Sequence, residues 1–147
     1  RTPGGDPLMP QGAVMTAREW VRFGEFVRAG GKAGGRSLVD PATFRQLFRS
    51  SAANPGYGIT WWLPHAQAAG GEGPSSDFGR NAARLPADLV VAAGAGDQRL
   101  YVIPSRRMTI VRLASFSLRD AVAERRGGAA VWSDTEFLET LLGSPGR

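Results

Sequence analysis

The stretch LVVAAGAGDQRLYVIPSRRMTIVRL, residues 89–113, decides the fold of this chain. It contains three runs that are rich in β-branched and other apolar residues, at 89–93, 99–103 and 108–113. The two connections, GAGD and PSRR, are short and carry the Gly, Pro, Asp and Ser residues that favour turns. Because connections this short join antiparallel neighbours, the stretch predicts a three-stranded antiparallel meander.

Three helix starts flank this meander. Residues 16–19 (TARE) and 133–136 (SDTE) are capping boxes, in which the hydroxyl and the carboxylate satisfy free backbone N–H groups of the first turn. Asp40 followed by Pro41 predicts a third start, with the aspartate as N-cap and the proline at the first helical position. Large apolar residues recur at helical spacing after each start, and we expect core faces from Trp20, Phe23, Val27, Phe44, Leu47, Phe48, Phe137, Leu138, Leu141 and Leu142. Together these elements predict an α+β fold, an antiparallel sheet flanked by helices.

The segments between these elements are less regular. Residues 57–63 (YGITWWL) are rich in β-formers and bounded by Gly56 and Pro64, which predicts a further strand. Residues 65–87 and 119–130 carry small, polar or charged residues without apolar periodicity. We expect both to be loops, the first of them a loop insertion.

Composition limits the possible classes. At 147 residues with 42% hydrophobic residues, the chain has the size and composition of one globular domain. Its net charge of +5 comes almost wholly from arginine, because Lys32 is the only lysine. The arginines are scattered singly or in pairs, which favours solvated faces over a nucleic-acid site. No apolar stretch approaches the roughly 20 residues that a membrane span needs.

Several kinds of active site are excluded by the residues present. Without cysteine there is no thiol nucleophile, disulfide or thiolate metal site, and a single histidine argues against zinc. That histidine, His65, is expected to be an ordinary surface residue. Gly31 and Lys32 lack the flanking residues of a phosphate-binding loop, and 94–96 is not followed by the third glycine of a dinucleotide fingerprint. We therefore expect no metal and no cofactor.

The motifs resemble, in order and spacing, the C-terminal part of the penicillin-recognising serine hydrolases, a superfamily of bacterial β-lactamases, penicillin-binding DD-peptidases, esterases and nylon-oligomer hydrolases. Residues 10–24 (PQGAVMTAREWVRFG) resemble the turn that enters a helix after the family's tyrosine motif. Residues 56–62 (GYGITWW) resemble the Gly-Tyr-Gly-x-x-Trp strand of the esterase and amide-hydrolase branches, and 94–98 (GAGDQ) the glycine-rich turn after the third active-site motif. The resemblance implies part of a β-lactamase/transpeptidase-like fold.

The family's nucleophile motifs are missing from this chain. In Ser-x-x-Lys the lysine lies one helical turn after the serine, but the residue three positions before Lys32 is Ala29. Tyr-x-Asn/Ser is absent too, because Ile59 and Ile103 stand two residues after the two tyrosines. The resemblance therefore implies that residues 1–147 are a single C-terminal portion of the domain, without the catalytic-serine portion and inactive alone.

The resemblance also implies a partial site. It places the family's Lys/His-Thr/Ser-Gly motif at Ala92, Ala93 and Gly94, where Ala92 lacks the cation that would hold a substrate carboxylate. The residue after the motif glycine donates a backbone N–H to the oxyanion hole, which implies that role for Ala95 in an intact parent. The alternative is that residues 94–96 are only a hairpin turn with permissive dihedral angles. The other substrate-binding residues implied by the resemblance are Gly96, Tyr57, Trp61 and Trp62.

Three functions stay open. The favoured one is the C-terminal segment of a serine hydrolase that cleaves ester, amide or peptide-like bonds through an acyl-enzyme. The others are a non-catalytic binding module of the same fold, suggested by Ala92 and the nearby aromatics, and an arginine-rich nucleic-acid binder. Under the first, the partners are a small ester or amide substrate and the N-terminal portion of the same domain, with no nucleic acid. Self-association through an open strand edge is then expected, and a periplasmic or secreted parent is implied.

Overall fold

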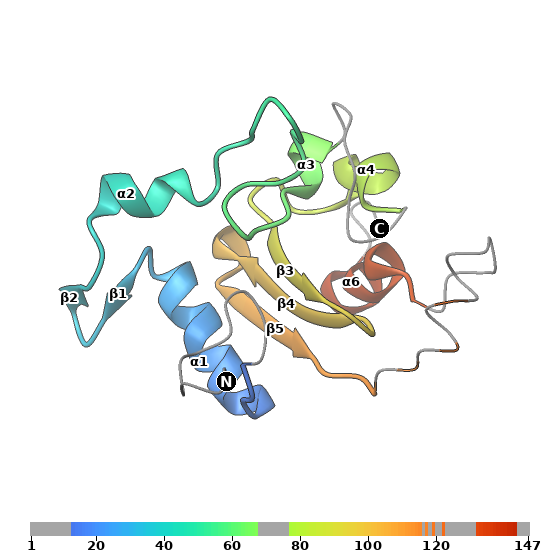
Figure 1. Cartoon of the computed structure of the whole chain (residues 1–147), viewed down its shortest axis with the longest axis horizontal. Coiled ribbons are helices and arrows are strands. Elements are labelled where there is room, and N and C mark those ends of the chain that lie inside the picture. The colour runs from blue at the N-terminus through green and yellow to red at the C-terminus, as the bar shows by residue number, and fades with distance from the viewer. Residues whose placement is uncertain are drawn as a thin grey trace, which may run out of the picture.

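A three-stranded antiparallel sheet of β3 (Val90–Gly94), β4 (Gln98–Ile103) and β5 (Met108–Arg112) lies at the centre of the structure (Figure 1). The computed structural model describes residues 13–67, 77–115 and 132–143 and the single positions 117, 119 and 122. The other elements are α1 (Ala17–Arg28), β1 (Lys32–Ala33), β2 (Arg36–Ser37), α2 (Pro41–Gln46), α3 (Pro64–Gln67), α4 (Phe78–Asn81), η1 (Ala82–Arg84), η2 (Pro104–Arg106) and α6 (Asp134–Leu142). This mixture of helices and antiparallel strands is the predicted α+β class.

The meander follows the predicted order. Val91 of β3 pairs with Tyr101 of β4, which pairs in turn with Ile110 of β5. The first turn closes through Gly96 and Asp97, whose φ angles are 69° and 59°. Both hairpins are confirmed, and each strand end lies within one residue of the predicted end, the usual scatter of element boundaries.

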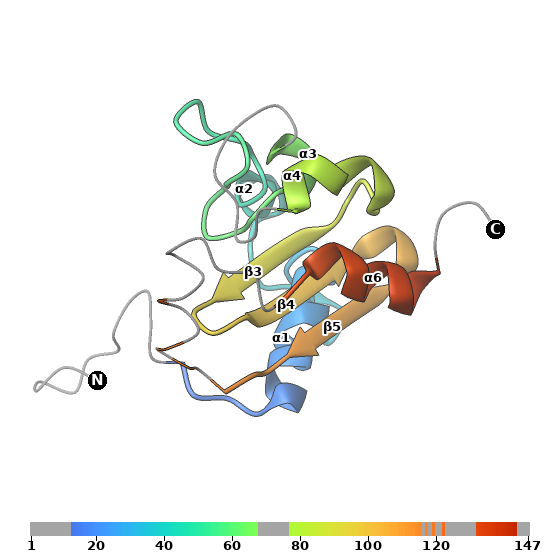
Figure 2. The ribbon, with the colours of Figure 1, turned by 90° about the vertical axis from the view of Figure 1, so that its right-hand side faces the viewer.

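The two faces of this sheet carry separate apolar clusters, because alternate residues of a strand point to opposite faces. On one face Tyr101 packs with Leu138 of α6. On the other face Leu100 and Val102 pack with Val27 of α1. Figure 2 shows α6 in front of the sheet and α1 behind it. The central strand β4 is therefore covered on both sides.

Helix α1 begins at the predicted capping box. The Thr16 hydroxyl oxygen accepts from the backbone N–H of Glu19 at 3.3 Å, and the Glu19 carboxylate accepts from the backbone N–H of Thr16 at 2.7 Å. That backbone bond lowers the pKa of Glu19 below its ordinary value. Farther along, Gly24 lies against Leu100 and Thr109, so the absence of a side chain lets the helix approach the sheet closely.

The other two predicted starts are also found. Asp40 accepts from the backbone N–H of Thr43 at 2.8 Å, and Pro41 opens α2. The Ser133 hydroxyl accepts from the backbone N–H of Glu136 at 3.1 Å at the start of α6, which is half of the predicted box. A cap from outside the helix adds to it, because Asp77 accepts from the backbone N–H of Thr135 at 3.0 Å.

Two residues expected in core faces are exposed. Phe23 of α1 is 41% exposed and Leu141 of α6 is 51% exposed. Leu138, one turn from Leu141, is fully buried, so α6 presents a narrower face to the core than its sequence predicts. The spacing of apolar residues shows which side of a helix is apolar, but it does not show how much of that side another element covers.

The strand predicted over residues 57–63 is wrong. The chain turns back on itself at Ile59 and Thr60, with single bridges from Tyr57 to Trp62 and from Trp62 to Val91. The backbone N–H of Gly58 donates to the carbonyl of Trp61 at 2.8 Å across this turn. A β-rich composition therefore formed a tight turn beside β3 and not an extended strand.

The loop predicted over residues 65–87 is only partly correct. Short helices α3, α4 and η1 occupy much of its described part, and Phe78 and Leu85 belong to the core cluster under α6. Residues 68–76 lie outside the described residues, as do most of the loop predicted at 119–130 and the start of the motif at 10–24. Within the described part of the chain, β5 pairs with β4 alone, so its other edge carries no strand there.

We predict that Gly24→Ala destabilises the chain, although alanine is the better helix former by about 1 kcal/mol. The new Cβ would lie 2.3 Å from Cγ2 of Thr109 and 2.8 Å from Cδ1 of Leu100, and overpacking of this kind costs about 1–3 kcal/mol or more. Because both distances are below 3.0 Å, the upper part of this range applies, and urea denaturation should show a net loss of about 1–2 kcal/mol after the helix gain. Arg22→Ala, at an exposed position of the same helix, is the control and should change stability by less than about 0.5 kcal/mol. An unchanged or raised midpoint for Gly24→Ala would contradict the close approach of α1.

Candidate functional site

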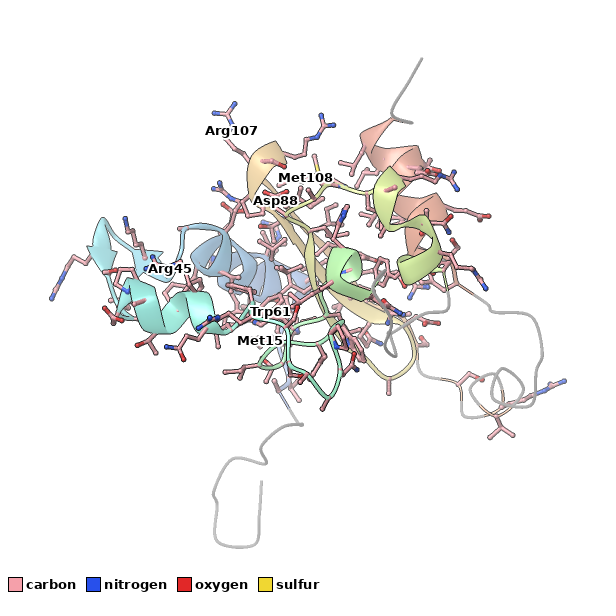
Figure 3. The ribbon with its side chains drawn as sticks, turned by 90° about the horizontal axis from the view of Figure 1, so that it is seen from above. Met15, Arg45, Trp61, Asp88, Arg107 and Met108 are labelled. Carbon is pink, nitrogen blue, oxygen red and sulfur yellow. The ribbon has the colours of Figure 1, made fainter. Side chains whose placement is uncertain are left out.

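A cavity of about 710 Å³ lies beside the end of β3. It is bordered by the segment before α1, by α1 itself, by the turn before α3 and by the ends of all three strands of the sheet. Figure 3 labels Met15 and Trp61, which come to this cavity from the first and the third of these segments. Its volume falls in the range of about 300–1,000 Å³ that is typical of small-molecule sites.

Five of the predicted site residues line this cavity. They are Ala92, Ala93, Gly94, Tyr57 and Trp61. They come from two segments, 57–61 and 92–94, that are more than 30 positions apart in sequence. The bridge between Trp62 and Val91 holds these two segments together. The sheet and the turn therefore bring together residues that the sequence could only group by resemblance.

The other three predicted site residues lie next to the cavity without lining it. Ala95 and Gly96 form the tip of the β3–β4 turn, where Ala95 is exposed. Trp62 packs against Tyr57 with ring centroids 4.5 Å apart, and it joins the apolar cluster under α6. The position of Ala95 at an exposed turn tip is compatible with either of its two interpretations, as an oxyanion donor or as part of a structural turn.

Arg99, a charged residue that was not predicted from the sequence, borders this cavity, and its side chain lies on the face of the sheet that α6 covers. Its side chain is only 3% exposed, and its five N–H donors have five acceptors. Nε donates to Asp134 at 2.9 Å, Nη1 to the carbonyls of Gly94 and Gln98 at 3.4 and 3.1 Å, and Nη2 to Asp97 at 3.1 Å and Asp134 at 3.4 Å. Arg99 thus fastens both ends of the turn that carries Ala95.

The Asp134 carboxylate is the buried centre of this network. It is fully buried and accepts from Tyr101 Oη at 2.5 Å and from Trp132 Nε1 at 3.2 Å in addition to Arg99. It is also the first residue of α6, where the positive end of the helix dipole favours a carboxylate. A second arginine, Arg112, also contacts this network. Its guanidinium lies 3.8 Å from the centre of the Trp132 ring and donates to the Asp97 carbonyl.

Thr60, which lines the cavity, has an unusual backbone conformation. Its φ is 67°, and for a β-branched residue this left-handed conformation is strained. Such strain amounts to about 1–3 kcal/mol and tends to occur at functional sites. Three hydrogen bonds fix the turn around it, from Gly58 to Trp61, from Ile59 to Leu47 and from Trp62 to Val91.

Phe23 and Trp20 complete the aromatic wall. Both were expected in the core. Trp20 does pack against the cluster on the α1 face and also lines the cavity, whereas Phe23 lines the cavity and stacks on Trp61 with ring centroids 6.4 Å apart. Of Trp20, Phe23 and Arg99, only Arg99 could have been identified from the sequence, because a single charged residue within the mostly apolar run 98–103 indicates a buried charge with a partner. Nothing in the spacing of Trp20 and Phe23 distinguishes a cavity wall from a core face.

His65 is not an ordinary surface residue as predicted. It is half-buried, and its Nε2 lies 3.0 Å from the carbonyl oxygen of Leu85, so it ties α3 to the end of η1. It borders a second cavity of about 360 Å³ that Asp88 also lines. The Asp88 carboxylate is already committed, accepting from the backbone N–H of Ser105 at 2.6 Å and from its hydroxyl at 2.7 Å.

The described residues contain no group of three or more histidine or acidic side chains placed to hold a metal ion. No helix within them has both the length and the apolar character needed to cross a membrane. Comparisons with protein-family models and with curated proteins found no match for this chain. The functional interpretation therefore rests on the residues and their geometry.

We predict that Asp134→Ala lowers the free energy of unfolding by about 3–5 kcal/mol, because it leaves the buried Arg99 guanidinium without its main counter-charge. Glu139→Ala on the same helix removes the partner of Arg84, whose side chain is 56% exposed, and should cost less than about 1 kcal/mol. Urea denaturation followed by circular dichroism compares the two. Equal losses in both variants would show that the Arg99–Asp134 pair adds nothing beyond a surface ion pair.

A pH dependence follows from Tyr101. Burial, and then the charge of Asp134, raise the pKa of its hydroxyl far above the ordinary value of about 10. Because the folded-state pKa is raised, the stability is fully present below about pH 10 and is lost as the pH rises above it, by up to about 1.4 kcal/mol per pH unit. At pH 9 the Tyr101→Phe variant should have a lower free energy of unfolding than the unsubstituted chain, because it lacks the bond to Asp134. Between pH 9 and 11 its free energy of unfolding should fall by less. Parallel curves for the two proteins would contradict the raised pKa.

Proposed function

We propose that this chain is the C-terminal portion of a serine hydrolase of the β-lactamase-like superfamily. In this proposal the parent cleaves an ester, amide or peptide-like bond through an acyl-enzyme, and the serine, lysine and tyrosine motifs lie on sequence outside residues 1–147. The observation that carries the proposal is the cavity beside β3, which gathers Tyr57, Trp61 and the 92–94 strand end. These come from the segments that carry the resemblance.

The proposed contribution of this chain is to complete the substrate cleft. The Ala95 backbone N–H would donate to the oxyanion that develops on the substrate carbonyl oxygen. Arg99 is the positioning residue for this donor, because it binds the carbonyls of Gly94 and Gln98 and the side chain of Asp97 around the turn. A turn fixed in this way would present the N–H without reorganisation during the reaction.

The open edge of β5 would receive the rest of the domain. Among the described residues β5 has no second neighbour, and an unpaired edge favours addition of another strand. We expect the N-terminal portion of the same domain to pair here. In its absence, a second copy of the chain is the expected partner.

A non-catalytic binding module is the second candidate. It is favoured by Ala92, which gives the cavity no cation or imidazole at the motif position, and by the aromatic lining that remains useful without chemistry. The residues encoded upstream discriminate between the two, since a binding module would lack Ser-x-x-Lys in the parent as well. An arginine-rich nucleic-acid binder is less favoured, because the one arginine that borders the cavity, Arg99, has all its donors bound within the protein.

We predict that the chain alone forms no adduct with fluorophosphonates or β-lactams, whereas a parent extended upstream is labelled once on its Ser-x-x-Lys serine. Intact-mass measurement detects the adduct and peptide mapping locates it. In the labelled parent, Ala95→Pro removes the N–H and should lower turnover about a hundred- to thousand-fold, while Ala95→Gly keeps it and should have little effect.

A melting curve is the control for folding of Ala95→Pro, since proline can also disturb the turn. A serine adduct on residues 1–147 alone would overturn the assignment of the nucleophile to upstream sequence. A folded Ala95→Pro parent with nearly full turnover would instead remove the oxyanion role and leave the turn structural.

A further inference from the structure

The cavity beside β3 is lined mainly by apolar side chains. Four aromatic residues, Trp20, Phe23, Tyr57 and Trp61, share it, and Phe23 and Trp61 stack on each other. At the β3 side the lining residues are Ala92, Ala93 and Gly94. Ala92 is on the same face of the sheet as Leu100 and Val111, so only a methyl group occupies the space there. A site of this kind gains most from burying an apolar group of similar size.

The one charged residue in the lining, Arg99, directs its side chain toward Asp134 on the face of the sheet that α6 covers, so it is not available to a ligand. All five N–H groups of Arg99 have acceptors within the protein, and its charge is balanced by Asp134 and Asp97. The amide of Gln98 is also committed, because it donates to the Ala114 carbonyl and accepts from the Ala114 backbone N–H. Among the described residues, the cavity therefore offers no free cation to an anionic ligand.

Uncharged polar groups are present. Thr60 and Tyr57 are lining residues that carry hydroxyls, and a hydroxyl can donate to or accept from a neutral carbonyl group. Burying a carboxylate here would leave it without a counter-ion, which is far more costly than burying a hydrogen-bonded neutral group.

We infer that this cavity binds a neutral aromatic or branched-alkyl group attached to an uncharged carbonyl, and that it rejects the corresponding carboxylate. The inference rests on the proposed function for the chemical role of this group, as the acyl or leaving side of an ester or amide. Binding itself needs no serine, so it is measurable on the chain alone.

The experiment titrates the chain with 4-phenylbutyramide and with 4-phenylbutyrate, which differ in charge and little in shape. Two of the four tryptophans, Trp20 and Trp61, line the cavity and report binding through their fluorescence. We expect saturable binding of the amide and at least about tenfold weaker binding of the carboxylate. Carboxylate binding as tight as that of the amide, or no saturable binding of the amide, would overturn the inference.

Three variants locate the site. Phe23→Ala removes part of the wall at a position exposed enough to tolerate it, and should weaken amide binding at least about fivefold. Leu141→Ala, at a similarly exposed position on α6 outside the cavity, is the matched control and should bind as the unsubstituted chain does. Ala92→Lys supplies the absent cation and should reverse the preference toward the carboxylate. Amide binding unaffected by Phe23→Ala would place the ligand elsewhere and overturn the assignment.

The failures of the two proposals are distinguishable. If the chain binds the amide selectively but its extended parent is never acylated, the neutral-ligand site stands and the hydrolase proposal is wrong. If the parent is acylated on serine but the chain does not prefer the amide over the carboxylate, the hydrolase proposal stands and the neutral-ligand site is wrong.

Discussion

The buried pair between Arg99 and Asp134 is the interaction on which the rest of the structure depends. It joins the central strand β4 to the first residue of α6, and it does so inside the apolar face of the sheet. Two buried charges are tolerated only because Tyr101, Trp132 and the β3–β4 turn supply the remaining hydrogen bonds. The same guanidinium thus fixes the sheet against its covering helix and holds the turn at the cavity.

What could be predicted from sequence was local. The meander and the three helix starts depend on residues within a few positions of one another, such as Thr16 with Glu19 and Asp40 with Thr43. The short helices in 65–87 were missed, because each is shorter than the window that shows periodicity. The turn at 57–62 was missed because Thr60 takes a conformation that its own preference opposes, imposed by contacts with Leu47 and Val91.

The site was predictable only in part, for a related reason. Resemblance grouped Tyr57, Trp61 and the 92–94 strand end, and the fold places these residues around one cavity. It did not reveal Phe23 or Arg99, because their roles depend on what covers each face of α1 and β4. Which face of an element is covered depends on how the helices pack on the sheet, and the spacing of residues in the sequence does not give that packing.

The strained tip at Thr60 has a consequence for the motions of this chain. Its conformation is held by bonds to two segments that come from opposite directions, Leu47 before it and Val91 after it. If either segment moves away, the tip relaxes and its backbone N–H groups meet solvent, so this turn should be among the first regions to open under native conditions. Amide hydrogen exchange at Ile59 and Trp62 would then report the integrity of the whole cavity wall, well before the sheet itself begins to exchange.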